Sequence, residues 1–473
     1  MAADPQQPQP EDGNLPAALL QAIAYPGGGR VVLVTGAGCS VEAPTRLPLA
    51  DQLARDCFRQ LVEDLVLEDN ACESPDDLSA VADSVFAARN SQRELVERFP
   101  PDRFRRATPN EGHTLAAALM REGAISNILS LNFDLAQDTA LSNVGAAEEV
   151  ATIVGPGDHH RLIARNLVYL HRCITSDPDE LILRTMQLEE WMDRWEEVVA
   201  QRVIGGSVTV FVGLGSPAGV LLETTSRILG SVEGGALVYV VDPADRERSQ
   251  FFAKLGLGPD TYVQLGWTEF MRTLSDRVVR EHVAALSLAS EDMTAENGWH
   301  SEDVAMVCAQ LRTLGLFRLG RLRAQWLLRD EPYTPHPTAP EVQRMLADLI
   351  IGLSMLQRLT GRDMRCADSG IVEFEDAEGR RTSLLVGSGG GHRRWAHVEG
   401  AIGHRIQQLA PGFRAIRWAL VAGVAGGRTT IAPPPDITGE RVRASVVTAG
   451  DDFAILTVDE LRSDPGLAAE LVA

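Results

Sequence analysis

Short apolar runs alternate with longer segments of helical period between residues 15 and 285. The apolar runs are rich in β-branched residues, end in Gly, Asn, Asp or His, and lie at 30–36, 125–134, 166–171, 208–215 and 236–243. Segments such as 48–65 and 113–123 repeat apolar residues at the helical period. Buried strands that alternate with helices predict an α/β fold, in which helices cover both faces of a parallel sheet. Ligands of such sheets bind at the carboxyl ends of the strands.

The pattern changes after residue 285, which predicts a second domain. The expected parts are a disordered tail (1–14), the α/β domain (15–285), a linker (286–300) and a smaller α+β domain (301–473). In the second domain, helical patterns at 301–329 and 339–360 precede β-rich stretches at 370–387 and 417–423.

The net charge of −21 is distributed unevenly, with about −17 on residues 1–290 and about −4 on residues 291–473. An acidic first domain repels phosphates, so we expect it not to bind nucleic acid directly. The six cysteines have no paired spacing, which is typical of a reducing cytoplasm. No apolar run reaches the roughly 18 residues of a membrane helix, and the first 16 residues lack a signal-peptide pattern, so we expect no membrane contact.

The segment VLVTGAGCSVEAP (32–44) runs from a predicted strand into a Gly-Ala-Gly turn. Gly36 and Gly38 would let the backbone approach a pyrophosphate, and amides at the start of the next helix would bind its charge. A turn of this kind also occurs for purely structural reasons. The dehydrogenase fingerprint needs a glycine where this chain has Val41, and an acid about 20 residues later, where the pattern is helical. A hydride-transferring dehydrogenase is therefore disfavoured.

Further motifs follow in order. PNEGH (109–113) precedes a helix, NFD (132–134) ends a strand, and LVYLHR (167–172) and VFVGLGS (210–216) end two more. With the GAGCS turn they resemble, in this order, the sirtuin family over roughly residues 28–275. The resemblance implies a Rossmann-like parallel sheet, NAD+ as the bound dinucleotide and a catalytic histidine.

Two departures from that family bear on function. Zinc-containing sirtuin deacylases carry four cysteines between the histidine and the G-x-S loop, whereas this chain has only Cys173 there. Arg172 stands where the family often has glycine after its histidine. We therefore expect no zinc, and the changes resemble the zinc-free sirtuin-like NAD+ hydrolases of bacterial antiphage defence.

The resemblance and the chemistry of NAD+ together suggest three catalytic residues. Cleavage of the nicotinamide–ribose bond passes through a cation at the ribose, which the enzyme orients while it presents a nucleophile and a base. We expect Asn132 to hold the ribose hydroxyls or a water, Asp134 to hold the ribose or the nicotinamide amide, and His171 to be the general base. The ordinary pKa of histidine, about 6.5, suits that role.

Each of these residues also has a purely structural interpretation. Asn132 and Asp134 are at a strand end, where such side chains commonly cap the next helix. A histidine at a strand end is often a satisfied structural residue. We expect His113 to anchor its helix rather than to take part in chemistry.

The predicted dinucleotide-binding residues are Gly36, Ala37, Gly38, Cys39, Ser40, Gly215, Ser216 and Asp242. Ser40 and the amides of 36–39 would hold phosphates, and Ser216 would contact the phosphate or ribose on the adenosine side. Asp242 would bind the hydroxyls of the adenine ribose, or be a turn residue before Pro243. The thiol of Cys39 has no obvious activating base, so we expect it to pack.

The second domain offers no complete site of its own. Residues 345–391 resemble in part the restriction-endonuclease core, with Asp368 in place of the first acid. The next strand lacks the second acid and the lysine, so metal-dependent cleavage would lack both ligand and base. We expect a degenerate relic or an unrelated α+β domain that regulates the first domain or binds a partner. The Arg-rich segment 311–329 predicts an amphipathic helix with a solvated basic face, or a docking surface for an acidic partner.

These observations predict an NAD+ glycohydrolase that releases nicotinamide and ADP-ribose. The resemblance implies an effector of abortive-infection defence that self-associates or acts with a second defence protein, either an ATPase or an Argonaute-like subunit. Two alternatives stay open. One is a zinc-free deacylase or ADP-ribosyltransferase, and the other is a non-catalytic module that senses NAD+ or ADP-ribose.

Overall fold

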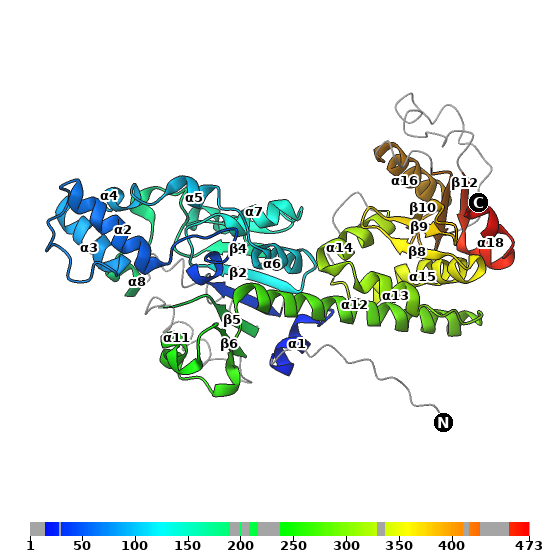
Figure 1. Cartoon of the computed structure of the whole chain (residues 1–473), viewed down its shortest axis with the longest axis horizontal. Helices are drawn as coiled ribbons and strands as arrows, with labels where there is room; N and C mark the ends of the chain where they lie inside the picture. The colour runs from blue at the N-terminus through cyan, green and yellow to red at the C-terminus, as the bar shows by residue number, and fades with distance from the viewer. Residues whose placement is uncertain are drawn as a thin grey trace. The chain divides into compact units, whose positions relative to one another are not determined.

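The chain divides into two compact units, Met1–Arg277 and Val278–Ala473 (Figure 1). The computed structural model describes residues 15–27, 30–189, 199, 208–215, 237–328, 336–409, 416–425 and 454–472. The expected tail at 1–14 lies outside these residues. Among the helices in this part of the chain, none has the length and apolar content needed to cross a membrane.

The first unit is built on a seven-stranded sheet. Its strands are β1 (Val31–Thr35), β2 (Ile125–Ser130), β3 (Ala151–Ile153), β4 (Asn166–Tyr169), β5 (Val208–Val212), β6 (Val238–Val241) and β7 (Tyr262–Val263). They lie in the order β3-β4-β2-β1-β5-β6-β7, and all the neighbouring pairs are parallel. The predicted α/β class with a Rossmann-like parallel sheet is confirmed.

Helices surround this sheet. They are α1 (Ala17–Ile23), α2 (Ala50–Glu63), α3 (Leu78–Arg89), α4 (Arg93–Val96), α5 (Pro101–Arg105), α6 (Glu111–Arg121), α7 (Ala136–Asn143), α8 (Thr185–Glu189), α11 (Gln250–Leu255) and the first part of α12 (Trp267–Asn297), which belongs to the second unit after Arg277. Short 3₁₀ turns lie at Ala37–Ser40, Pro156–Arg161, Pro178–Glu180, Arg246–Arg248 and Pro259–Thr261. With helices on both faces, the central strands are buried on both sides, which explains why β1 reads VVLVT and β5 reads VTVFV.

The direction of chain winding reverses beside β1. β2 pairs with one edge of β1 and β5 with the other, and Thr35 stands level with Ser130 on one side and Val212 on the other. The connections that follow neighbouring strands at such a reversal diverge and leave a crevice outside the carboxyl ends. The crevice of this unit is therefore expected after β1, β2 and β5.

Helices α2, α3 and α4 pack on one another and form a cluster, drawn in blue in Figure 1. We call these three helices the helical cluster. Its buried core includes Leu53 and Leu61 of α2, Val81 of α3 and Leu95 of α4. The segment that follows β4 contributes Ile174, Leu181 and Leu183 to the same core.

The second unit contains a smaller, mixed sheet, which confirms the predicted α+β character. Its elements after α12 are α13 (Ala305–Arg312), α14 (Gly315–Trp326), α15 (Pro340–Thr360), β8 (Asp363–Cys366), β9 (Ile371–Glu375), β10 (Arg381–Ser388), α16 (Trp395–Gln408), β11 (Trp418–Ala422), β12 (Ala454–Thr457), α18 (Val458–Ser463) and α19 (Leu467–Leu471). The strand order is β12-β11-β10-β9-β8. β8, β9 and β10 are antiparallel neighbours, whereas β10, β11 and β12 are parallel.

Two sequence expectations differ from this structure. Residues 286–297, expected in a linker, continue α12, in which Leu286 and Ser290 are buried. The described part of the Arg-rich segment 311–329 is not a single helix, because α13 ends at Arg312 and α14 begins at Gly315, whose φ is +68°.

The charges of this Arg-rich segment are partly used inside the second unit. Arg318 and Arg321 are half-exposed and contact the carboxylate of Asp368 at 3.8 and 3.2 Å, whereas Arg323 is buried. Asp368, the candidate for a first nuclease acid, is therefore paired with two arginines.

Candidate functional site

The turns after β1 and β5 interlock through glycines. The amides of Gly36 and Gly38 donate to the carbonyl oxygens of Val212 and Gly213 at 3.0 and 2.9 Å. A Cβ atom on Gly36 would lie 2.5 Å from the carbonyl oxygen of Gly213. Gly213 has φ +70°, and a Cβ there would lie 2.7 Å from the amide nitrogen of Cys39. Only residues without side chains allow these two backbones to approach so closely.

This packing limits which backbone amides are available for the expected phosphate contacts. Three of the amides expected to bind phosphate already donate within the protein. They are those of Gly36 and Gly38 and that of Cys39, which donates to the carbonyl oxygen of Gly36 at 3.0 Å. The turn also leads into a 3₁₀ turn rather than an α-helix, and α2 begins only at Ala50. Pro44 and Pro48 lie in the intervening segment and lack amide donors, which disfavours a helix there. The expected contact of the turn with phosphates stays a prediction, resting mainly on Ala37 and Ser40.

A cavity of about 740 Å³ lies at this edge of the sheet. The predicted residues that line it are Gly36, Ala37, Gly38, Ser40, Asn132, Asp134, His171, Gly215 and Asp242. Cys39 is buried beside the cavity, where its thiol faces the carbonyl oxygen of Val212 at 3.5 Å, as expected for a packing residue. Ser216 lies outside the described residues. Proteins bind small molecules in cavities of about 300–1,000 Å³, so this one has the size of a ligand site.

Three polar side chains meet on the floor of the cavity. The hydroxyl of Ser40 donates to a carboxylate oxygen of Asp134 at 2.9 Å, and it accepts from the side-chain amide of Asn132 at 3.3 Å. The other carboxylate oxygen of Asp134 accepts from the amide of Ala136 at 2.9 Å, at the start of α7. The N-cap residue of α7 is Leu135, but the carboxylate of Asp134 accepts from the first amide of this helix and also lines the cavity.

Burial governs the charge state of Asp134. The residue is 4% exposed, and desolvation raises the pKa of its carboxyl, while hydrogen bonds from Ala136 and Ser40 oppose the rise. These two donors keep the carboxylate oxygens in place. The group is thus held as a rigid acceptor rather than a solvated charge.

Two buried polar atoms at this cavity have no hydrogen-bond partner among the described residues. They are the side-chain oxygen Oδ1 of Asn132 and the ring nitrogen Nε2 of His171. Buried polar atoms are normally paired, and an unpaired one in a cavity indicates a place for a ligand or water. Within the described part of the chain, the side-chain oxygen of Asn132 caps no helix, and the imidazole of His171 is not fully hydrogen-bonded as a structural histidine would be.

The environment of His171 differs from the sequence expectation. Burial lowers the pKa of its imidazole to about 4, and repulsion from the neighbouring Arg172 adds to the shift. The ring is consequently neutral throughout the physiological pH range. The pKa of His171 therefore differs from the ordinary value near 6.5 that the sequence predicts for a general base.

Arg172 occupies an unusual backbone conformation. Its φ of +69° lies in the left-handed region that favours glycine. Its side chain is 7% exposed and lines a second cavity, of about 550 Å³. Ile182 lines both cavities, so it lies in the wall between them.

His113 does not line the cavity, although its ring nitrogen Nδ1 is also buried without a partner among the described residues, and its expected role as an anchor for its helix stays a prediction. Its ring packs edge-on against Trp267, with ring centres 5.9 Å apart, and burial lowers the pKa of the imidazole to about 4. Asn110 caps α6 by accepting from the amide of His113 at 3.0 Å, and it also accepts from the indole of Trp267 at 3.2 Å. A Cβ on Gly112 would lie 2.3 Å from this indole, which explains the glycine.

The far end of the cavity reaches β6 and α11. A carboxylate oxygen of Asp242 accepts from the amide of Ala244 at 2.9 Å, so the turn interpretation of this residue is correct and it lines the cavity as well. Arg248, Ser249 and Gln250 also line this end. Sequence reasoning missed them, because no fixed spacing links them to the Gly-Ala-Gly turn.

The helical cluster forms another part of the cavity wall that sequence reasoning missed. Leu53, Leu78 and Ser79 of this cluster line it there, together with Leu49, Asp76 and Asp77, which lie just before α2 and α3. Their contribution depends on how a separate group of helices packs against the sheet. No local sequence motif predicts such packing.

The described residues contain no group of three or more His, Cys, Asp or Glu side chains arranged to hold a metal ion. Cys173 is buried with its sulfur 3.1 Å from the hydroxyl of Thr175. Whether the protein binds zinc stays a prediction from the cysteine count.

No family model and no curated protein matches this sequence. Among solved structures, the chain is similar to a Sir2 homologue in complex with NAD, with 16% identity over 55% of this chain and 93% of that one, and a TM-score of 0.33. It is also similar to Sir2 with a p53 peptide and NAD+, with 15% identity over 55% of this chain and 97% of that one, and a TM-score of 0.32. These values do not assign the chain to a family.

Proposed function

We propose that the protein hydrolyses the bond between nicotinamide and ribose in NAD+, releasing nicotinamide and ADP-ribose. The observation that carries this proposal is the pair of buried, unpartnered atoms, Oδ1 of Asn132 and Nε2 of His171, at one cavity. An amide oxygen that accepts a hydrogen bond and a neutral imidazole that accepts a proton are the groups that hydrolysis at a ribose carbon needs.

The dinucleotide is proposed to lie along the carboxyl edge of the sheet. Its pyrophosphate would lie over the turn at Gly36–Ser40, and its adenine ribose near Asp242, as the motifs predict. The nicotinamide ribose would lie over Asn132, with its hydroxyls donating to Oδ1. The Ser40–Asp134 hydrogen bond fixes the neighbouring side chains before the substrate arrives, which reduces the entropy lost on reaching the transition state.

The proposed reaction needs little base strength. The C1′–N bond breaks, its electron pair goes to the pyridine nitrogen, and nicotinamide leaves as a neutral molecule. Water attacks the cationic C1′, and its proton passes to Nε2 of His171 and then to solvent. The products are ADP-ribose, nicotinamide and one proton. An imidazole with a pKa of about 4 suffices, because a water bonded to a cationic carbon is strongly acidic.

Nicotinamide release from NAD+ without any peptide tests the proposal. The full-length chain, alone and with the products of adjacent genes, should form nicotinamide and ADP-ribose in equal amounts. His171→Ala should lower the rate at least 100-fold, whereas His159→Ala, an exposed histidine, should leave it unchanged.

The same assay separates the alternatives. Nicotinamide release that requires an acyl-lysine peptide would indicate a deacylase, and ADP-ribose found on protein would indicate a transferase. Binding of NAD+ or ADP-ribose with no release under any of these conditions would contradict the proposal and indicate a sensor.

We also propose a role in abortive-infection defence, which rests on the sequence resemblance alone. Cells carrying the wild-type gene should lose NAD+ after phage infection, while cells carrying the Asn132→Ala variant should not. Equal NAD+ levels in both strains during infection would contradict this role. Co-purification before and after infection would reveal self-association or an ATPase or Argonaute-like partner.

A further inference from the structure

His171 lies at the base of a closed loop. His171 lies just after the end of β4. The chain then runs away from His171 and comes back to it at Ile182, whose amide donates to the carbonyl oxygen of His171 at 3.2 Å. We call residues 171–182 the histidine loop. Near its base, the amide of Ile174 donates to the carbonyl oxygen of Phe133 at 2.9 Å, which ties the loop to the segment that carries Asn132. The position of the imidazole therefore depends on how this loop is held.

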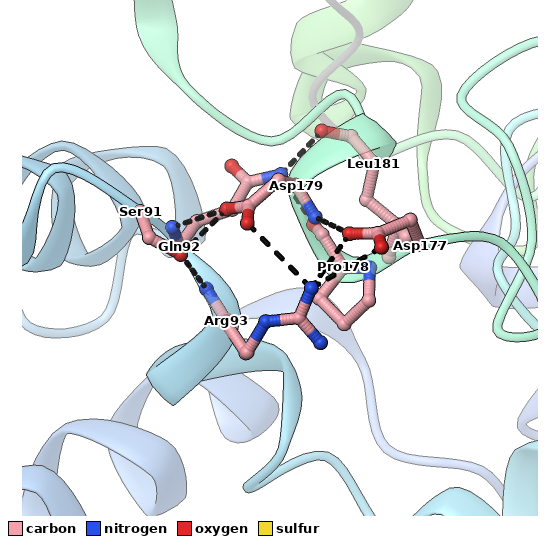
Figure 2. Close-up of polar contacts among 7 residues, drawn as sticks. All are labelled: Ser91, Gln92, Arg93, Asp177, Pro178, Asp179 and Leu181. Atoms are coloured by element: carbon pink, nitrogen blue, oxygen red, sulfur yellow. Dashed lines mark hydrogen bonds and ion pairs between the residues drawn. The ribbon is translucent and has the colours of Figure 1, made fainter.

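One buried glutamine holds the far side of the loop. Gln92 lies between α3 and α4, is 1% exposed, and donates from its side-chain amide to the carbonyl oxygens of Pro178 and Leu181 at 2.8 and 2.6 Å (Figure 2). Both acceptors are carbonyl oxygens, so only the NH2 group of the glutamine fits between them. The two bonds span four residues of the loop and close its tip onto the helical cluster.

Exposed contacts surround this buried pair of bonds. A carboxylate oxygen of Asp179 accepts from the backbone amide of Gln92 at 2.9 Å and from the hydroxyl of Ser91 at 2.7 Å (Figure 2). Arg93 donates to Asp177 at 2.9 Å. The side chains of Arg93 and Asp177 are about half-exposed, and exposed ion pairs contribute little to stability. The buried glutamine is therefore the stronger part of the connection.

The same helical cluster also lines the proposed NAD+ cavity. Leu53 and Leu78 face the cavity on one side, while Ile182 and Leu183 face it from the loop and just beyond. After the loop, the guanidinium of Arg184 stacks over Phe86 of α3 at 3.8 Å. The cluster is thus joined to the histidine loop at its tip and just past its end.

We propose that Gln92 is a positioning residue for His171, which it holds against the cavity by fixing the histidine loop to the helical cluster. The role in turnover rests on the proposed hydrolysis of NAD+, but the effect on the loop does not. In sirtuins that bind zinc, a metal module occupies the corresponding interval. In this chain the interval carries one cysteine, and a side-chain amide holds its first part.

The sharpest variant is Gln92→Glu, which keeps the shape of the side chain but replaces its NH2 group with an oxygen. Two carbonyl oxygens would then face a carboxylate, and the loop should detach from the cluster. Gln60→Glu, on the exposed face of α2, is the matched control. Asp179→Ala weakens the same connection from the exposed side and serves if Gln92→Glu does not fold.

Turnover and loop opening are measured separately. In Gln92→Glu we expect kcat to fall about 10- to 100-fold with KM within about threefold, because a small displacement of a catalytic group is costly. Lowering the pH should recover part of kcat, since protonation of the introduced carboxyl restores one donor.

Hydrogen exchange of the Ile182 amide should be at least about 10-fold faster in Gln92→Glu than in the wild type, while exchange of the Leu170 amide, which donates to the carbonyl oxygen of Ser130 at 2.9 Å, should be unaffected. Asp179→Ala should change both readouts in the same direction by less.

The outcomes separate the two proposals. If the wild-type protein does not consume NAD+, the proposed function fails. The role of Gln92 is then still decided by hydrogen exchange of the Ile182 amide and by the NMR signals of the His171 imidazole, compared between the wild type and Gln92→Glu. Unchanged Ile182 exchange and unchanged His171 signals in a folded variant would overturn the inference. A fall in kcat with unchanged Ile182 exchange would overturn it as well, because the loss would not act through the loop.

Discussion

The hydroxyl of Ser40 donates a hydrogen bond to the carboxylate of Asp134 across 2.9 Å, and so joins the turn after β1 to the segment after β2. Ser40 also accepts from Asn132 at 3.3 Å, which places one hydroxyl between two proposed site residues. Because Asp134 is buried, losing this donor would leave a carboxylate oxygen unpaired.

Ser40→Ala should lower the free energy of unfolding by about 1–3 kcal/mol and the rate of NAD+ consumption at least 10-fold. Asp134→Asn should have a similar effect, and the double variant should cost less than the sum of the two by about 1 kcal/mol. Urea denaturation and steady-state kinetics measure these quantities. Ser142→Ala, an exposed serine at the end of α7, is the control. Strict additivity would show that the two side chains act independently.

Asn132→Ala should abolish turnover while NAD+ binding is retained. The amide acts on the ribose as the bond breaks, so its loss should reduce kcat at least 100-fold, with the Kd for NAD+ changed less than about 10-fold. Calorimetry and nicotinamide release give the two numbers. Asn143→Ala, exposed on α7, should resemble the wild type. Turnover within threefold of the wild type would remove Asn132 from the proposed site.

The pH profile of turnover should be flat from about pH 6 to 8. His171 has a pKa of about 4, so it is already deprotonated over that range and only loses its basic form below about pH 5. Initial rates of nicotinamide release in buffers of constant ionic strength measure the profile. A rise with a midpoint near 6.5 would show that the imidazole has its ordinary pKa and that the buried environment described for it is wrong.

His113→Leu should make the first unit less sensitive to acid. The pKa of His113 is lowered to about 4 in the folded state, so the unfolded state binds the proton first as the pH falls below about 6.5. This histidine should therefore cost about 2 kcal/mol of stability between pH 7 and pH 5, and the loss is complete only below about pH 3. Denaturation at both pH values should show a smaller difference in the variant. An equal acid sensitivity in the variant and the wild type would refute the assignment.

Gly213→Ala should destabilise the protein strongly, because a Cβ there would meet the amide of Cys39 at 2.7 Å and the residue has φ +70°. Gly215→Ala, in the same turn, places its Cβ more than 4 Å from any atom of the described residues beyond its chain neighbours, and should change the melting temperature little. Thermal unfolding of both variants measures the contrast. Similar melting temperatures for the two would mean that the turns after β1 and β5 are not interlocked.

Much of the fold is predictable because its elements carry strong local patterns. The helix expected at 339–360 is α15, Pro340–Thr360, which begins with a proline and is followed by Gly361 at φ +63°. β1 and β5 fall within the apolar runs expected to be strands. The edge strands β3 and β7 are too short to leave a pattern. Residues 286–297 of the expected linker are helical because they continue α12, in which Leu286, Ser290 and Thr294 are buried.

The site is predictable to the extent that parallel strands bring their carboxyl ends together. That rule places Asn132, Asp134 and His171 at one cavity. It does not reveal that the amides of Gly36 and Gly38 are occupied by the neighbouring turn, or that burial lowers the pKa of His171. Nor does it find Gln92, because its acceptors lie about 90 residues away in sequence and meet it only in the packed structure.

The two outer strands of the seven-stranded sheet limit how this sheet can pair with another chain. β3 has three residues and β7 has two, so each edge offers few unpaired backbone groups to another chain. Short edges discourage the strand-to-strand pairing that leads to fibres. If copies of this chain associate through the first unit, an interface made of side chains on its helices is favoured over extension of the seven-stranded sheet. Such an interface has a definite size and can be dismantled, whereas a growing sheet has neither property.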